Sequence, residues 1–560
     1  MSSLASALHQ SLGRLIGHSP DGANASAALQ QVVAALTAAL ERGELAVDLE
    51  GPPPPPHDGA DSQGDLSWPA SHLAALAACG WLVQAEDLAA RPEAPVVRDG
   101  RWLRWRRWHQ ELQNCLEALI ARGRDPLQPA PSAEQRRSAR DHAARAGLDP
   151  QQCAAVEALL SRRLVLLSGG PGTGKTSTVV QMLAAALRLQ PELRLQLAAP
   201  TGKAAGRLAA AVSQGAHQLQ DAPLAARLQE LTGTTLHRLL EARGDGAGFR
   251  RDQRRPLELD LLVVDEVSMV DLPLMAALLA ALPPACRLLL VGDPGQLPPV
   301  GPGAVLLELS RPAALAALGP AALELRTTYR NDGAIADLAG ELRQIEASGP
   351  ELLTHLRPRL AALEAEANLN WLEEPANRTP AQALRRLQQH QQRLQALALA
   401  LPQASDDLQA ATAARQALLA ALEELIVLSP IRQGRWGVDG LHGALLGDAA
   451  NRGPMHWPLG TPVLNTRNLS EQGLANGDIG VLVAAAGERL VLFPGDRLLH
   501  PARLVQAAPA LALTVHKAQG SQYREVLLLL PASRACDARL LYTGLTRARQ
   551  RAWLITPRQA

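Results

Sequence analysis

The chain has 560 residues, of which 47% are hydrophobic and 19% are charged, and its formal net charge is +1. This length exceeds one ordinary core and predicts about two to four domains. The balanced charge excludes a protein that is basic throughout, so any nucleic-acid surface must be local. A secretory leader and an apolar run of membrane length are both absent from the sequence, which predicts a cytoplasmic protein with no membrane partner. Five scattered cysteines without metal-ligand spacing are expected to be buried thiols.

Residues 1–135 are expected to form a mainly helical N-terminal domain that interacts with a partner. Within it, Val96–Cys115 interleaves arginines with Trp102, Trp105 and Trp108. Such a segment could follow a phosphate backbone and stack bases. Alternatively, it is an edge strand leading into a helix, with its tryptophans packed inward or against a partner and its arginines in solvent. The three-residue spacing of the tryptophans, typical of one helical face, favours the second interpretation.

A glycine-rich stretch that begins at Gly169 has the pattern of a phosphate-binding loop. The apolar run Leu164–Leu167 predicts a strand before it, and a helical pattern follows it. Backbone N–H groups and the helix N-terminus then favour bound phosphates. Lys175 is expected to reach the β- and γ-phosphates, and the Thr176 hydroxyl to bind Mg²⁺. The residues expected to hold ATP in this loop are Gly169, Gly170, Pro171, Gly172, Thr173, Gly174, Lys175, Thr176 and Ser177.

An apolar strand at Leu259–Val264 ends in the acidic pair Asp265 and Glu266. Ligands of open α/β sheets bind at the carboxyl ends of parallel strands, where this pair would lie. Asp265 is expected to hold Mg²⁺ beside Thr176, and Glu266 to take the proton of the attacking water.

The next predicted strand, Cys286–Val291, is followed by Gln296 in a segment rich in proline and glycine. The Gln296 amide could sense the γ-phosphate or its attacking water. The segment as far as Gly303 is expected to be a rigid loop that couples the nucleotide state to a second ligand.

Polar residues that follow other predicted strands are candidates for contact with a polynucleotide. Each of them taken alone is more often a helix cap or an ordinary histidine, but together they could donate hydrogen bonds to phosphates. These residues are Thr201, Lys203, His237, His516, Lys517 and Gln519. Farther along, residues 345–422 have a helical composition without catalytic signals, and residues 463–508 are expected to form a small β insertion.

Eight motifs stand in the order GGPGTGKT, APTGKAA, TTLHRLL, VVDEVSMVD, GDPGQLPPVGPG, TTYRN, TVHKAQGSQ and YTGLTRAR. This set resembles the superfamily 1 DNA helicases, and TVHKAQGSQ with LNTRN…NGDIG is similar to their RecD group, the α subunit of exodeoxyribonuclease V. The resemblance extends over residues 95–555. It implies an α/β fold with two RecA-like P-loop NTPase domains, at 136–322 and 323–560, that bind ATP between them.

The resemblance also implies roles for three further residues. Gln152 matches a glutamine that contacts adenine. Arg330 and Arg547 match two arginines that reach the γ-phosphate across the cleft, where such a group stabilises the charge of the transferred phosphoryl.

The function that the resemblance implies is an ATP-dependent 5′–3′ DNA helicase. In that family the chain is the motor subunit of the RecBCD complex in double-strand break repair by homologous recombination. RecB- and RecC-like partners, single-stranded DNA and duplex ends are then expected, with ATP and Mg²⁺ as cofactors and no nuclease site in this chain. A free-standing RecD-like helicase and a structural subunit regulated by nucleotide remain as alternatives.

Overall fold

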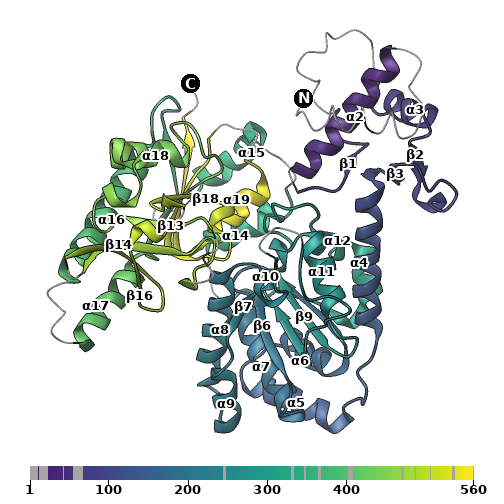
Figure 1. Ribbon diagram of the computed structural model, residues 1–560, viewed down its shortest axis with the longest axis horizontal. Coiled ribbons are helices and arrows are strands. Elements are labelled where there is room, and N and C mark those ends of the chain that lie inside the picture. Colours follow the sequence, from purple (N-terminus) through teal and green to yellow (C-terminus); the bar gives the residue numbers. More distant parts are fainter. Residues whose placement is uncertain are drawn as a thin grey trace.

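The computed structural model describes residue 11 and residues 23–558, except for 42, 54–66, 244–247, 330–332, 346–348, 364–367, 402–407, 468, 470–471, 486, 505 and 532–535. Two α/β units lie side by side, and a smaller N-terminal unit adjoins one of them (Figure 1). Arg330, expected to reach the γ-phosphate, falls outside the described residues.

The N-terminal unit contains a sheet as well as helices. Its four strands lie in the order β1-β4-β3-β2, with α2 (Ala23–Glu41) and α3 (Ala70–Ala78) packed together beside them. The strands are β1 (Val47–Asp48), β2 (Leu82–Gln84), β3 (Val96–Asp99) and β4 (Trp102–Trp105). The expectation of an edge strand in the tryptophan segment is wrong, because β4 pairs on both sides.

The tryptophans of this segment do not share a helical face. Trp102 and Trp105 lie on β4, and Trp108 lies on α4 (Arg106–Arg124). The expectation of solvated arginines also fails at Arg104, which is 1% exposed and pairs with Asp99 at 2.6 Å. Cross-strand pairing decides this arrangement, and a three-residue spacing in the sequence cannot reveal it.

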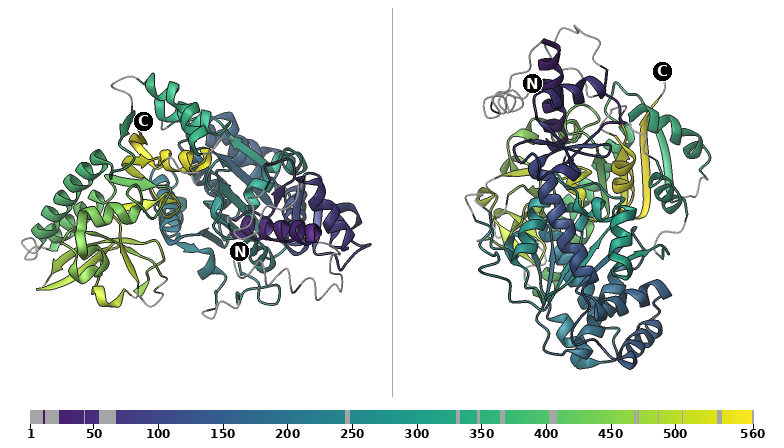
Figure 2. Two further views of the ribbon diagram at one scale, coloured as in Figure 1. Left: turned by 90° about the horizontal axis from the view of Figure 1, so that it is seen from above. Right: turned by 90° about the vertical axis from the view of Figure 1, so that its right-hand side faces the viewer.

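The first motor unit is built on six parallel strands in the order β10-β5-β9-β8-β6-β7. Successive residues of β5 alternate between two apolar clusters, so both faces of the sheet are covered by helices. Helix α4 lies against one of these faces (Figure 2). Its Leu112 and Leu119 belong to the apolar cluster on that face. The strands are β5 (Leu164–Gly169), β6 (Leu195–Ala199), β7 (Gly233–Thr235), β8 (Leu261–Val264), β9 (Arg287–Gly292) and β10 (Ala322–Leu325).

The helices of the first motor unit connect these strands as parallel pairing requires. They are α5 (Ala133–Arg145), α6 (Pro150–Ser161), α7 (Lys175–Leu189), α8 (Gly202–Ala216), α9 (Ala222–Gln229), α10 (Leu236–Leu239), α11 (Leu272–Ala281), α12 (Val305–Leu309) and α13 (Pro312–Leu318).

The second motor unit has five parallel strands in the order β11-β20-β19-β12-β18. They are β11 (Leu369–Glu374), β12 (Leu425–Ser429), β18 (Ala512–Thr514), β19 (Tyr523–Leu529) and β20 (Ala548–Pro557). Strand β11 lies inside residues 345–422, so that segment is not entirely helical. The helices of the second motor unit are α14 (Ala334–Leu342), α15 (Gly349–Ala361), α16 (Ala381–Ala400), α17 (Leu408–Ala421), α18 (Val438–Leu446) and α19 (Ala538–Leu545).

A separate antiparallel sheet is inserted into the second motor unit, in the order β16-β15-β14-β13-β17. Its strands are β13 (Pro462–Asn465), β14 (Ile479–Ala485), β15 (Glu488–Phe493), β16 (Arg497–Leu499) and β17 (Ala507–Pro509). Within the described part of the chain, no helix is long and apolar enough to span a bilayer. All five cysteines are buried free thiols, as expected.

Candidate active site

The phosphate-binding loop joins β5 to α7, as the sequence predicts. Gly172 and Gly174 both adopt φ +77°, a left-handed conformation that favours glycine. The Lys175 ammonium donates hydrogen bonds to the carbonyl oxygens of Gly169, at 2.7 Å, and Gly170, at 2.8 Å. Burial lowers the pKa of Lys175, and the carboxylates of Asp293, Asp265 and Glu266 oppose that shift. The lysine is therefore held inside the loop, and Thr176 and Ser177 are exposed at the start of α7.

Gln152 lies directly against this loop. It is 3% exposed, and its amide donates to the Thr173 carbonyl oxygen at 3.2 Å. The same residue completes a capping box with Asp149 at the start of α6. Tyr329 adds a contact that the sequence did not predict: its phenol donates to Asp149 at 2.7 Å, and its N–H to the Gly172 carbonyl at 2.8 Å.

The acidic pair at the end of β8 has a strained backbone. Glu266 adopts φ +52°, and its N–H donates to the Asp265 carboxylate at 2.8 Å. A left-handed conformation at a residue other than glycine costs about 1–3 kcal/mol and is characteristic of functional sites. Burial and the Glu266 charge raise the pKa of Asp265.

The Asp265 carboxylate and the Thr176 hydroxyl are donors that suit Mg²⁺ bound together with phosphates, rather than a metal ion held only by protein side chains. The described residues contain no group of three or more His, Cys, Asp or Glu side chains able to hold a metal ion. Mg²⁺ is commonly bound by one or two protein oxygens together with phosphates and water. Asp265 and Thr176 match that requirement.

The loop after β9, residues Asp293–Gly303, is here called the sensor loop. Asp293 is buried and accepts hydrogen bonds from the Gly295 N–H at 3.0 Å and the Gln296 amide at 3.3 Å. The Gln296 side-chain oxygen is buried and has no hydrogen-bond partner among the described residues. Because buried acceptors are normally satisfied, this oxygen is suited to accept a hydrogen bond from a water molecule or a bound ligand.

The second motor unit binds the sensor loop at Leu297. The Thr543 hydroxyl accepts from the Leu297 N–H at 2.8 Å, and the Gln519 amide donates to the Leu297 carbonyl at 3.2 Å. The Leu297 side chain packs in the apolar core of the second unit. Gln519 is 7% exposed, so the expectation of a DNA-facing amide does not hold in this conformation, because the closed interface occupies that side chain.

Arg547, from the second motor unit, lies near the phosphate-binding loop of the first. It is 2% exposed and donates to the carbonyl oxygens of Thr543, at 3.0 Å, and Ser521, at 3.4 Å. Its charge contributes to lowering the pKa of Lys175, after the larger effect of burial. The two cations therefore repel each other across the junction of the two units, and a bound polyphosphate would offset this repulsion.

Helix α8 forms a second contact between the units. Thr201 caps this helix, with the Ala204 N–H at 3.2 Å from its hydroxyl oxygen, and the Lys203 ammonium lies 5.4 Å from the centre of the Tyr523 ring. Arg207 donates to the Gly520 carbonyl at 2.5 Å. The sequence analysis missed Arg207, although its position four residues after Lys203 places it on the same helical face.

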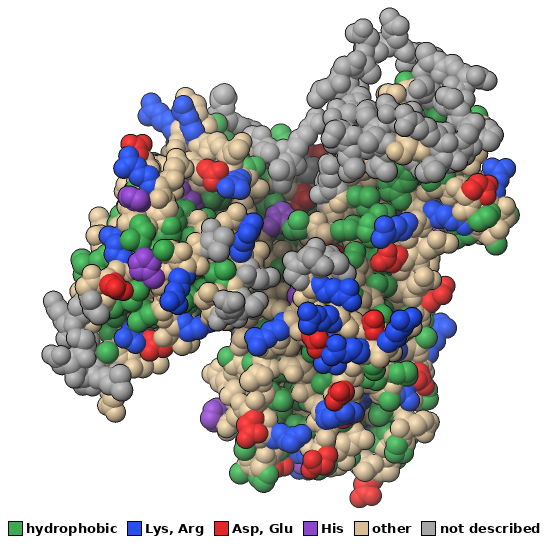
Figure 3. All heavy atoms as spheres, in the orientation of Figure 1, with side chains coloured by type: hydrophobic (Ala, Val, Ile, Leu, Met, Phe, Trp, Pro, Cys, Tyr) green, Lys and Arg blue, Asp and Glu red, His purple; other side chains and the backbone are tan. Residues whose placement is uncertain are grey.

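The other candidate DNA contacts are exposed. His237 lies on α10 with its ring 5.8 Å from that of Phe249, and His516 and Lys517 lie on a 3-10 turn after β18. A basic segment just after α10 was also missed. Its exposed members are Arg243, Arg250, Arg254 and Arg255, and Figure 3 shows Lys and Arg side chains gathered on this face of the first motor unit.

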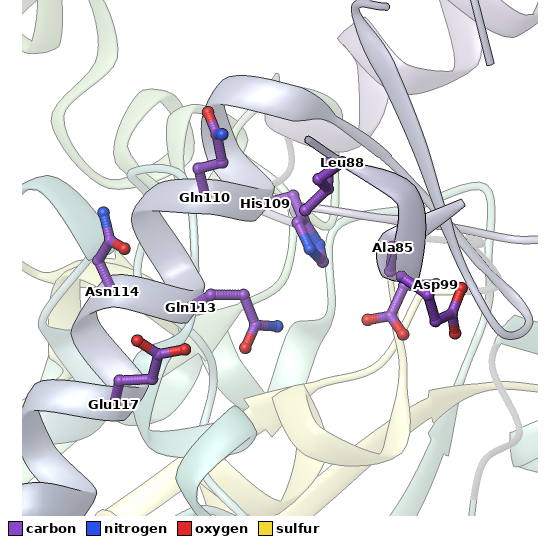
Figure 4. A pocket seen from close by; sticks show the side chains of 9 residues that line it. Ala85, Leu88, Asp99, His109, Gln110, Gln113, Asn114 and Glu117 are labelled. Carbon is purple, nitrogen blue, oxygen red and sulfur yellow. The ribbon is translucent and has the colours of Figure 1, made fainter. Parts of the chain in front are cut away.

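A surface pocket of about 460 Å³ lies on the N-terminal unit, away from these residues (Figure 4). It is lined by the polar face of α4 and by the segments around Glu86 and Asp99. None of the phosphate-loop or sensor-loop residues lines it, so it is not part of the nucleotide site.

The chain has two parallel sheets. A phosphate-binding loop follows a strand of the first sheet, and Arg547 belongs to the unit built on the second. This arrangement defines a P-loop ATPase with two motor domains. Residues 152–302 match the family described as an AAA domain, and residues 509–555 match the UvrD-like helicase C-terminal domain.

The chain is 38% identical to the RecBCD enzyme subunit RecD of Mycolicibacterium smegmatis, over 94% of this chain and 89% of that protein. It is 38% identical to the same subunit of Mycobacterium tuberculosis, over 93% and 85%. The chain belongs to the RecD family.

More distant relatives include the ATP-dependent RecD2 DNA helicase of Deinococcus radiodurans, 32% identical over 80% of this chain but 53% of that protein. Among solved structures, the Pif1 helicase of Candida albicans aligns with a TM-score of 0.40 and 16% identity, covering 74% of this chain and 95% of that one. That similarity is too low to add to the assignment.

Proposed function

We propose that the chain is the ATP-dependent 5′–3′ DNA helicase subunit of a RecBCD-type complex, exodeoxyribonuclease V, which acts in double-strand break repair by homologous recombination. The observation that carries the proposal is the junction at Leu297. A loop that follows a strand of the first motor domain is bound by Thr543 and Gln519 of the second. Relative motion of the domains therefore acts directly on the residues beside the phosphate-binding loop.

The proposed reaction is hydrolysis of ATP in this cleft. The phosphate-binding loop holds the phosphates through its N–H groups, and Lys175 moves from the loop carbonyls to the β- and γ-phosphates. Glu266 takes the proton of the attacking water, and the Gln296 side-chain oxygen orients that water. Thr176 and Asp265 would hold Mg²⁺, which would neutralise phosphate charge when bound. Arg547 and Arg330 stabilise the transferred phosphoryl group from the second domain, so hydrolysis requires a closed interface.

DNA binding is proposed along the exposed residues above the two domains. His237, His516 and Lys517, together with Thr201 and Lys203, would contact the backbone and bases of a single strand, which predicts sequence-tolerant and salt-sensitive binding. Closure with ATP and reopening after hydrolysis would then move the domains along the strand.

RecB- and RecC-like subunits are the proposed partners, with single-stranded DNA and duplex ends as substrates in the cytoplasm. The long matches to RecD subunits support this assembly over a free-standing helicase. Nuclease activity is assigned to another subunit.

The test is Lys175→Gln in the full chain, purified with its partner subunits. We expect hydrolysis stimulated by single-stranded DNA to fall by about a thousandfold or more, because this cation offsets phosphoryl charge. Unwinding of a 5′-tailed duplex by this subunit should be lost with it. Full unwinding by the variant would show that ATP binding here serves only assembly. Unwinding by the isolated wild-type chain would support the free-standing alternative.

A further inference from the structure

We propose that the N-terminal domain positions the sensor loop through Gly43 and thereby sets the rate of ATP hydrolysis. The inference rests on the proposed function, because it assigns a catalytic role to Gln296. The contact itself is a structural observation. The Gly303 N–H donates to the Gly43 carbonyl oxygen at 2.9 Å, which joins the end of α2 to the end of the sensor loop.

Only glycine fits at position 43, because a side chain there would clash with the sensor loop. It lies just beyond α2, where its N–H donates to the Leu40 carbonyl at 3.0 Å and its φ is +80°. A Cβ atom here would lie 2.4 Å from the Pro299 carbonyl oxygen and 3.1 Å from that of Gly301. Both obstacles are backbone atoms of the sensor loop, so a larger residue must displace the loop itself.

Leu45 anchors the same segment in the first motor domain. It is buried in the apolar cluster that contains Leu272 and Met275 of α11. A Cβ atom at Gly303 would lie 2.9 Å from the Leu45 side chain. The segment that contains Gly43 and Leu45 is therefore held in place by the first motor domain where it contacts the sensor loop.

A displacement at Pro299 would reach the cleft through few rotatable bonds. Only Pro298 and Leu297 separate Pro299 from Gln296. The rings of both prolines fix their φ angles, and the second motor domain holds Leu297 at both its N–H and its carbonyl. The sensor loop is thus bound at one end by the N-terminal domain and in the middle by the second motor domain. Gly43 acts as a positioning residue, through Gln296.

The experiment compares Gly43→Ala with Gly100→Ala in the full chain, purified with its partner subunits. Gly100 lies in the β3–β4 turn of the same domain with φ +58°, and a Cβ atom there meets nothing within 4 Å. Both variants carry the backbone strain of alanine at positive φ, but only Gly43→Ala pushes the sensor loop. The measurements are kcat and KM for ATP with single-stranded DNA, and amide exchange of the peptide that contains Gly303.

We expect Gly43→Ala to lower kcat by about tenfold with KM for ATP within about twofold, because small misplacements of a catalytic group cost this much or more. Exchange at Gly303 should become faster in this variant and stay unchanged in Gly100→Ala. Equal hydrolysis and equal exchange in the two variants would overturn the inference. Unchanged ATP hydrolysis by the Lys175→Gln variant in its complex would instead refute the proposed function.

Discussion

The phenol of Tyr542 donates a hydrogen bond of 2.6 Å to the carboxylate of Asp293, and this bond joins the second motor domain to the first. Burial and the charge of Asp293 raise the pKa of Tyr542, so the phenol remains a donor. Asp293 also receives the Gln296 amide. One buried carboxylate therefore connects the second motor domain to Gln296, the residue proposed to orient the attacking water.

Tyr542→Phe should weaken closure and slow hydrolysis. A hydrogen bond to a charged group contributes about 1.5–3 kcal/mol. If half of this stabilises the transition state, DNA-stimulated kcat should fall by about four- to twelvefold. Tyr523→Phe is the matched control, because the buried Tyr523 hydroxyl has no partner among the described residues. Steady-state hydrolysis checks both, and equal losses would contradict a specific role for the Asp293 contact.

Gln152→Ala should weaken nucleotide binding more than it weakens folding. Loss of the contact to the Thr173 carbonyl frees the phosphate-binding loop, and we expect KM for ATP to rise by about tenfold with kcat little changed. Gln135 occupies the same position in the capping box of α5 and is exposed. Gln135→Ala should lower only the melting temperature, since a lost cap costs about 1 kcal/mol. An unchanged KM for ATP in Gln152→Ala would refute the role of Gln152 in nucleotide binding.

Arg207→Ala should uncouple α8 from the second motor domain. Its guanidinium bonds the Gly520 carbonyl and lies near Glu266, whose charge opposes the lowering of the Arg207 pKa by burial. We expect DNA-stimulated kcat to fall by about tenfold, equivalent to about 1.4 kcal/mol. Arg227 donates to the Leu193 carbonyl within the first domain. Arg227→Ala should leave the rate near that of the wild type, and a similar drop in both would argue for a structural effect alone.

The basic segment after α10 should contribute to DNA affinity through phosphate contacts. Replacing Arg250, Arg254 and Arg255 by alanine should weaken single-strand binding at all sequences and reduce the slope of log Kd against log salt by about two. The control removes the exposed arginines Arg137, Arg140 and Arg145 of α5 instead. Binding titrations at three salt concentrations distinguish the two, and an unchanged slope in the first variant would exclude the segment from the DNA path.

The sequence was informative where a function depends on residues close together in the chain. The phosphate-binding loop needs glycines and a lysine at fixed spacing, so Gly169–Thr176 could be located without coordinates. Apolar runs likewise predicted the strands that end just before Asp265 and Asp293, because strands buried on both faces are hydrophobic throughout.

Patterns that depend on pairing between distant segments were less reliable. The tryptophan spacing suggested a helical face, but β4 pairs with β1 and β3 and buries Arg104 against Asp99. Strand β11 was not predicted, because it pairs with β20, which lies nearly two hundred residues later in the chain.

By itself, the sequence located the candidate residues of each half of this motor: a loop for phosphates, the acidic pair Asp265 and Glu266, and, through the resemblance, an arginine at position 547. Only the tertiary structure decided how the halves meet. Tyr542 begins the motif YTGLTRAR and Arg207 lies four residues after Lys203, but neither pattern reveals the contact that the residue makes. The contacts of Tyr542, Arg207 and Gly43 depend on atoms contributed by other domains. A contact across an interface is set by the packing of whole units, which short-range spacing does not encode.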